Sequence, residues 1–194
     1  MAVIGVILSG GRSSRMGEDK AALSLTGQNF LARITAELSP LFDELYVSVD
    51  RPGRYPDYRE LVDLRPGGGP LAGLEAAFLR TGAEAVFLAA VDLPFADRTL
   101  AADILAKGRY GDACAVRRSD GAAEPLFALY RRSCLPALTA CLDQGCRAAR
   151  TLLDRVDCRW LEERQLPEFC LERVLWNVNT REDLRQAADW VGEK

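Results

Sequence analysis

The sequence predicts an α/β protein built on one doubly wound sheet with helices on both faces. Short apolar runs, often β-branched, alternate along the chain with stretches in which apolar residues recur at helical spacing. Two glycine-rich segments each follow a strand-like run and lead into a helical pattern. No repeat, linker or low-complexity tract divides the 194 residues, so we expect one domain over residues 1–194.

The first half of the chain predicts four strands and two helices. Apolar runs of strand length lie at residues 3–8, 45–49, 61–62 and 85–91. A helix is expected from Asn29 to Leu38, and Pro40 ends it. A second helix is expected from Leu71 to Leu79. The run at 85–91 is continuously apolar, which is typical of a central strand in a parallel sheet.

The second half predicts two further strands, at 112–116 and 125–130, with a turn at 119–121 between them. Residues 133–142 form an amphipathic helical pattern, and another helix is expected to start at Gly145. Residues 156–169 show no regular pattern. Thr180 followed by Asp183 is a variant of the capping box, so the last helix is expected to start at Arg181.

Composition excludes several classes of function. The net charge of −3 is a poor match for a nucleic-acid-binding protein, which needs a broad basic face. No apolar run reaches the ~18 residues of a membrane span. No charged region precedes the first apolar run, so a signal peptide is not predicted and we expect a cytoplasmic protein.

The chain contains no histidine, which excludes a Ser-His-Asp triad, a Cys-His dyad and every histidine-ligated metal site. The six cysteines form no CxxC pair, so we expect reduced thiols rather than a zinc site. The remaining chemistry depends on carboxylates, lysine, backbone amides and a hard cation such as magnesium (Mg2+). Phosphoryl and nucleotidyl transfer can proceed with these groups, because the protein mainly positions groups and neutralises charge.

The stretch from Val3 to Lys20 carries the strongest functional signal. Its apolar run ends at Gly10 and Gly11, and Arg12, Arg15 and Lys20 follow. Glycines let backbone amides approach a ligand, and the basic side chains would surround it, which suits a polyphosphate. The usual GxxxxGK[ST] phosphate loop is absent because Gly17 is followed by Glu18. From this generic pattern alone, a solvated basic turn is an equally good interpretation.

The full string Leu8-Ser-Gly-Gly-Arg-Ser-Ser-Arg-Met-Gly-Glu-Asp-Lys-Ala21 resembles the signature loop of nucleotidyltransferases that act on sugar phosphates and on molybdopterin. The closest likeness is to the molybdenum cofactor guanylyltransferases. Ser9 departs from the usual alanine, and both residues are small. The resemblance covers the chain from Val3 to about Leu184. It implies a Rossmann-like three-layer fold with a mostly parallel sheet and one antiparallel strand late in the chain.

A second glycine-rich loop, 65–73, also opens onto a predicted helix. By itself it is better interpreted as a wide turn, but Gly-Pro-Leu-Ala-Gly73 is what the same family carries here.

Asp92 follows the apolar run at 85–91, and ligands of open α/β sheets bind outside such strand ends. A carboxylate there suits magnesium. The alternative, a helix N-cap, is weakened because the next helix is expected to begin near Asp97. Asp92 also resembles the family's metal-binding aspartate.

Three features of the second half also bear on the resemblance, and one of them departs from the family pattern. The segment 120–130 resembles it, but Glu124 stands where histidine or glutamine is usual. Arg147 follows Gly145, and the family uses basic residues after this glycine to contact the pterin. A solvated helix face is nevertheless the simpler interpretation of Arg147. Asn177 and Asn179 lie in the family's closing motif, where they face the acceptor. The same asparagines also suit turn and cap chemistry.

The resemblance implies a guanylyltransferase that joins GTP to molybdenum-bound molybdopterin and releases pyrophosphate. Its implied catalytic residues are Arg15, Lys20 and Asp92, with Asp92 holding Mg2+ and with Asn177, Asn179 and Arg147 at the acceptor. The implied nucleotide contacts are Leu8, Ser9, Gly10, Gly11, Lys20, Asp50, Asp63 and Asp92. The resemblance is also compatible with transient contact with molybdoenzymes or their chaperones. The alternatives are a cytidylyltransferase on the same cofactor, a sugar-phosphate nucleotidyltransferase and a non-catalytic nucleotide-binding partner.

Overall fold

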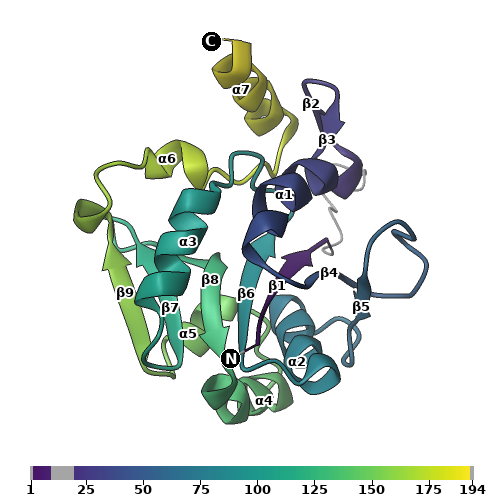
Figure 1. The fold of residues 1–194 in the computed structure, drawn as a ribbon, viewed down its shortest axis with the longest axis vertical. Helices are drawn as coiled ribbons and strands as arrows, with labels where there is room; N and C mark the ends of the chain where they lie inside the picture. Colours follow the sequence, from purple (N-terminus) through teal and green to yellow (C-terminus); the bar gives the residue numbers. More distant parts are fainter. Residues whose placement is uncertain (1, 10–19, 193–194) are drawn as a thin grey trace.

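In the computed structural model, which describes residues 2–9 and 20–192, the described residues form a seven-stranded sheet (Figure 1). The strand order is β5-β4-β1-β6-β8-β7-β9. β8 runs antiparallel to β6 and β7, and every other neighbouring pair is parallel. The predicted mostly parallel sheet with one antiparallel strand is confirmed. The strands are β1 (Val3–Leu8), β4 (Leu45–Val49), β5 (Glu60–Val62), β6 (Ala85–Ala90), β7 (Ala113–Arg117), β8 (Ala123–Arg131) and β9 (Cys158–Glu162).

Helices cover both faces of this sheet, as predicted. One apolar cluster joins the sheet to α1 (Phe30–Leu38), α3 (Arg98–Lys107), α6 (Leu171–Val174) and α7 (Arg181–Gly192). The other joins it to α2 (Pro70–Thr81), α4 (Leu135–Asp143) and α5 (Ala149–Leu153). Neighbouring residues of one strand point into opposite clusters, since Ile7 belongs to the first while Val6 and Leu8 belong to the second. The result is a three-layer sandwich.

Two predictions about the second half were wrong. Residues 158–162 form β9, an edge strand parallel to β7, where no regular element was expected. Its sequence hides the strand because the charged residues Arg159 and Glu162 interrupt it and only Leu161 is buried, as fits an exposed edge. The helix expected from Gly145 begins at Ala149 instead. Gly145 has φ +74° and its amide donates to Leu142 O at 2.9 Å, so it closes the turn after α4.

The start of the last helix is confirmed, and its cap has the predicted chemistry. The Asp183 amide donates to Thr180 Oγ1 at 3.1 Å, and the Thr180 amide donates to Asp183 Oδ2 at 2.7 Å. An unpredicted small hairpin, β2 (Ser24–Leu25) with β3 (Gln28–Asn29), precedes α1. Asn29 then caps α1, because its side chain accepts a hydrogen bond from the Ala32 amide at 2.7 Å.

All six cysteines are free thiols, and Cys114, Cys134 and Cys141 are buried. Burial raises the pKa of Cys114 to about 11 and that of Cys134 to about 12. These thiols therefore stay protonated at neutral pH and act as small apolar groups in the core. Within the described ranges, no helix is both long and apolar enough to cross a membrane.

Candidate functional site

The carboxyl ends of β1, β4 and β6 lie level with one another. Leu8 pairs with Ser48 of β4 on one side and with Ala90 of β6 on the other. The residues that follow these strands therefore share one edge of the sheet, which is where ligands bind in open α/β folds. Asp92 and Ser9 both lie at this edge, as the sequence predicted.

Lys20 contacts two other predicted site residues. Its Nζ donates to Asp92 Oδ2 at 2.7 Å and to Asn179 Oδ1 at 2.7 Å. The Lys20 and Asp92 side chains are 17% and 16% exposed, so solvent screens their ion pair only partly. The amide of Val178 also donates to the Asp92 carbonyl at 2.9 Å, which ties the closing motif to the end of β6. Lys20 and Asn179 are 159 residues apart in sequence, and the fold brings them into direct contact.

The second oxygen of Asp92 has the character of a ligand site. Oδ1 is buried and has no hydrogen-bond partner among the described residues. Asp92 is not a helix cap, because Asp97 caps α3 by accepting from the amides of Thr99 and Leu100 at 2.7 and 3.1 Å. An unpaired carboxylate oxygen is the ligand type that magnesium prefers. No group of three or more acidic, cysteine or histidine residues that could hold a metal occurs in the described part of the chain. A cation here would therefore depend on Asp92 together with substrate oxygens and water.

A chain of hydrogen bonds links the ends of β1, β4 and β5. Ser9 Oγ donates to Ser48 O at 2.6 Å, and Ser48 Oγ donates to Asp63 Oδ1 at 2.8 Å. Burial raises the pKa of the Asp63 carboxyl, the nearby charge of Asp50 adds to this effect, and the bond from Ser48 opposes it. Asp50 is exposed and pairs with Arg54 at 3.3 Å. Sequence analysis missed Ser48, although a serine inside the apolar run at 45–49 was a visible signal.

The second glycine-rich loop does open onto a helix, since α2 begins at Pro70. Its N-cap, Gly69, has φ +66°, a conformation that favours glycine. Gly73, in the first turn, packs directly on the strand ends. A Cβ there would lie 2.6 Å from Ser48 Oγ and 2.8 Å from Leu8 Cδ2. The N-terminus of α2 is therefore fixed close to the Ser9–Ser48–Asp63 chain.

A buried carboxylate holds this loop in place. Glu75 of α2 is 2% exposed, and its carboxylate accepts from Arg65 Nε at 2.8 Å and from Thr139 Oγ1 at 3.2 Å. Arg65 also bonds Asp143 of α4 at 2.6 Å. Arg147 adjoins this loop, since a Cβ built at Gly69 would lie 3.3 Å from the Arg147 carbonyl oxygen. With the loop's glycines it lines a cavity of about 170 Å³, and its side chain is exposed.

The predicted acceptor residues therefore fall into two places. Asn179 lies in the Lys20–Asp92 network, and its Nδ2 donates to the carbonyl of Asn177 at 3.4 Å. Asn177 Nδ2 donates to Leu175 O at 3.3 Å, so the expected turn chemistry is also present. Among the described contacts, none joins Arg147 to either asparagine.

Glu124, whose role the sequence left open, lies close to this network. Burial raises the pKa of its carboxyl. The same pKa is lowered by the hydrogen bond from the Leu126 amide, by the charge of Arg118 and by the Asn177 side chain. The charge of Asp92 raises it further. The carboxylate accepts from the Leu126 amide at 3.3 Å. The start of β8 thus adds a third polar side chain beside Asp92.

The predicted residues Gly10, Gly11 and Arg15 lie outside the described residues.

The family model of the MobA-like NTP transferase domain matches residues 5–160. The molybdenum cofactor guanylyltransferase of Sinorhizobium fredii is 36% identical over 202 residues, covering 96% of this chain and 90% of that protein. A probable molybdenum cofactor guanylyltransferase of Pelotomaculum thermopropionicum is 33% identical over 186 residues, covering 94% of this chain and 90% of that protein.

The fold also matches solved structures. Molybdopterin-guanine dinucleotide biosynthesis protein A from Archaeoglobus fulgidus superposes with a TM-score of 0.85 at 22% identity, over 98% of this chain and 100% of that one. The 2-C-methyl-D-erythritol 4-phosphate cytidylyltransferase of Thermus thermophilus gives 0.67 at 17% identity, over 96% of this chain and 97% of that one. These likenesses support the fold alone.

Proposed function

The chain belongs to the MobA-like NTP transferase family, and from that premise we propose that it is a molybdenum cofactor guanylyltransferase. In this proposal it transfers GMP from GTP to the terminal phosphate of molybdenum-bound molybdopterin and releases pyrophosphate. Relatives that carry this name match the chain over more than nine tenths of its length. The observation that carries the proposal is the contact of Lys20 with both Asp92 and Asn179, which brings the predicted nucleotide and acceptor residues together.

This nucleotidyl transfer can proceed in a protein without histidine. The attacking phosphate of the acceptor is already an anion, so no general base is needed. The α-phosphorus lies between the attacking phosphate and the leaving pyrophosphate in an in-line transfer, and the protein contributes positioning and charge. Lys20, with Arg15 and the backbone amides of Gly10 and Gly11, would hold the pyrophosphate. Lys20 is suited to this role because two contacts already fix its ammonium group.

Nucleotidyltransferases of this family typically use a divalent metal, and we propose that Asp92 holds Mg2+. Its Oδ1, which is buried and has no hydrogen-bond partner among the described residues, fits a hard cation. Such a cation would supply positive charge to the phosphate oxygens. Asp92 Oδ2 would keep Lys20 in place at the same time.

We assign the remaining residues to the two substrates. Leu8, Ser9, Asp50 and Asp63 would contact the nucleotide, since they follow or end β1, β4 and β5. Asn177 and Asn179 would contact the acceptor. Arg147 stays in the proposal as a more distant acceptor contact, supported only by its basic, exposed side chain beside the Gly67–Gly69 loop. The enzyme would act in the cytoplasm and transfer its product through transient contact with molybdoenzymes or their chaperones.

The proposal is tested by measuring pyrophosphate release with GTP, CTP, ATP and UTP, each without an acceptor, with molybdenum-bound molybdopterin and with a sugar phosphate. We expect release with GTP that depends on the acceptor. Release with CTP would indicate the cytidylyltransferase alternative. Release only with a sugar phosphate as acceptor would indicate the sugar-nucleotide alternative. Binding of nucleotide without release under any condition would indicate a non-catalytic partner protein.

A further inference from the structure

Glu124 lies beside the proposed site, and the transfer reaction as described above gives it no role. It is at the start of β8, the strand that runs antiparallel to β6. In that pairing Ala89 lies opposite Phe127, and the same register continued by three residues brings Glu124 opposite Asp92. Burial raises the pKa of the Glu124 carboxyl and the charge of Asp92 adds to this effect, in agreement with this placement. Glu124 is therefore at the edge of the sheet where the two substrates would meet.

The Asn177 side chain is hydrogen-bonded on two sides. Its Nδ2 donates to Leu175 O at 3.3 Å. The Asn177 side chain also forms a hydrogen bond with the carboxylate of Glu124. An ionised carboxylate can only accept hydrogen bonds, so Nδ2 is the donor in this bond as well. Both hydrogens of Nδ2 are then used, and Oδ1 is left as the polar atom for which the described residues supply no partner.

Arg118 ties together the two segments that carry this contact. Its Nη2 donates to the carbonyl of Leu171 in α6 at 3.4 Å and to that of Leu175, the C-cap of this helix, at 3.2 Å. The Arg118 charge also favours the charged form of Glu124. Arg118 lies in the turn between β7 and β8, so one side chain links the hairpin that carries Glu124 to the segment that carries Asn177.

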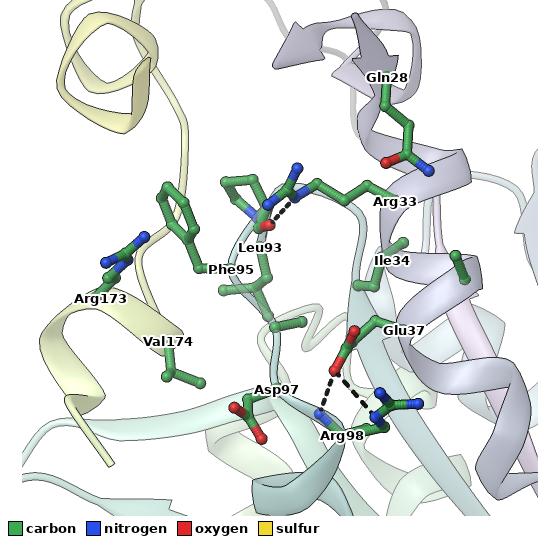
Figure 2. Close-up of a pocket in the computed structure, with 13 residues that line it drawn as sticks. Gln28, Arg33, Ile34, Glu37, Leu93, Phe95, Asp97, Arg98, Arg173 and Val174 are labelled. Atoms are coloured by element: carbon green, nitrogen blue, oxygen red, sulfur yellow. Dashed lines mark hydrogen bonds and ion pairs between the residues drawn. The ribbon is translucent and has the colours of Figure 1, made fainter. Parts of the chain in front are cut away.

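The segment after Asp92 is held from another side. A pocket of about 550 Å³ lies between α1, the segment 93–98 and α6 (Figure 2). In this pocket the Phe95 ring lies between the guanidinium groups of Arg33 and Arg173, whose central carbons are 5.9 and 4.9 Å from the ring centroid. Because Arg33 belongs to α1 and Arg173 to α6, these contacts fix both helices against the segment that follows Asp92. The frame around the closing motif is therefore set before a substrate binds.

The remaining hydrogen-bonding groups of the two closing asparagines are complementary. Asn179 Oδ1 accepts from Lys20 Nζ at 2.7 Å, and its Nδ2 gives one hydrogen to the carbonyl of Asn177 at 3.4 Å. The second Nδ2 hydrogen of Asn179 is left as a donor, whereas Asn177 offers the acceptor Oδ1. A pterin ring carries both N–H donors and nitrogen and oxygen acceptors, so this pair of groups suits it.

We propose that Glu124 is a positioning residue for the acceptor: its carboxylate holds one Nδ2 hydrogen of Asn177 and thereby directs Asn177 Oδ1 to accept a hydrogen bond from an N–H group of the pterin. This inference rests on the proposed function and adds the chemical group that Asn177 recognises. Without Glu124 the amide can turn over and present Nδ2, which cannot accept from an N–H group. A hydrogen-bonding group left unpaired on binding weakens recognition of the substrate.

Steady-state kinetics of pyrophosphate release with GTP and molybdenum-bound molybdopterin tests this proposal. Glu124→Ala should raise the KM for molybdopterin about tenfold, while the KM for GTP stays within about threefold of wild type. Glu124→Gln should restore the KM for molybdopterin to within about threefold of wild type, because its amide oxygen can still accept from Asn177 Nδ2. Glu163→Ala is the matched control. Glu163 holds the same hairpin by accepting from the Ser119 amide at 2.8 Å, and no described contact joins it to Asn177.

A double-mutant cycle shows whether Glu124 acts through Asn177. In an Asn177→Ala background, Glu124→Ala should change the KM for molybdopterin by less than about twofold, because no amide is left to orient. Thermal melting checks each variant. If Glu124→Ala does not fold, Glu124→Met takes its place, since methionine is of similar length and lacks the carboxylate.

Three results would overturn the positioning role. They are an unchanged KM for molybdopterin in Glu124→Ala, an effect that adds in full to that of Asn177→Ala, and an equal rise in Glu163→Ala. Each of these is measured against a wild-type enzyme that transfers GMP. A wild-type chain that releases no pyrophosphate with GTP and molybdopterin would instead refute the proposed function, and this inference with it.

Discussion

Replacing Asp92 with alanine should separate catalysis from folding. The Lys20–Asp92 pair is 2.7 Å long and mostly shielded from solvent. Exposed pairs contribute under about 1 kcal/mol, and breaking a fully buried pair costs about 3–5 kcal/mol. At 16–17% exposure this pair lies between those limits, and Asn179 still accepts from Lys20 after the change. The substitution also removes Oδ1, a buried oxygen without a hydrogen-bond partner in the described part of the chain. We therefore expect a loss of about 1–2 kcal/mol in the free energy of unfolding.

The expected effect on turnover is larger. Loss of one preorganised charge-stabilising group lowers kcat by about 10²-fold or more, which corresponds to about 2.7 kcal/mol. GTP binding should stay measurable, because Lys20 remains. The assay is pyrophosphate release at saturating GTP and acceptor over a range of Mg2+ concentrations. The wild-type rate should rise with Mg2+, and the variant should lose most of this dependence.

Asp97→Ala is the matched control, since Asp97 lies five residues further along the same segment and caps α3. Loss of the cap costs about 1 kcal/mol of stability, close to the cost expected for Asp92→Ala. Its turnover should stay within a few-fold of wild type. Near-wild-type turnover of Asp92→Ala in magnesium buffer, or an equal loss in both variants, would refute the metal assignment.

Three further predictions concern packing, pH and the acceptor. Gly73→Ala places a Cβ 2.6 Å from Ser48 Oγ, so thermal unfolding should show a loss of about 1–3 kcal/mol. Burial raises the pKa of Glu124, so the folded state holds its proton to higher pH than the unfolded state does, and stability falls as pH rises through that interval. Urea unfolding should therefore show Glu124→Gln gaining stability relative to wild type from pH 4 to 7, with little difference near pH 3. Asn177→Ala and Asn179→Ala should weaken molybdopterin use while GTP affinity stays within a few-fold, as steady-state kinetics and GTP titration would show.

Each of these predictions has a control. An added Cβ at Gly192 meets no atom within 4 Å, so Gly192→Ala should leave unfolding unchanged. Glu168 is exposed, and Glu168→Gln should not reproduce the pH dependence of Glu124→Gln. For the asparagines, thermal melting must show an intact fold, because Asn179 adjoins the cap of α7. Reduced GTP affinity with unchanged acceptor use would reverse the two substrate assignments.

The sequence predicts those parts of the site that depend on local pattern. Asp92 was assigned correctly to a strand end because an uninterrupted apolar run of strand length precedes it. The cap formed by Thr180 and Asp183 was also predictable from local sequence, since both partners lie within one turn. The resemblance to the nucleotidyltransferase family added candidate roles for these residues.

Other features depend on contacts between distant segments. The bond from Lys20 to Asn179 spans 159 residues, and no local pattern predicts it. β9 was missed because an edge strand does not need a continuous apolar face.

Transfer of the nucleotide itself tests the central claim most directly. The wild-type chain is incubated with GTP labelled at the α-phosphate, Mg2+ and molybdenum-bound molybdopterin, and the products are separated by chromatography. The proposed function predicts that the label moves into the guanine dinucleotide form of the cofactor, in step with pyrophosphate release, and that Asp92→Ala abolishes most of this transfer. Label that stays in GTP, while labelled CTP yields a dinucleotide cofactor under the same conditions, would contradict it.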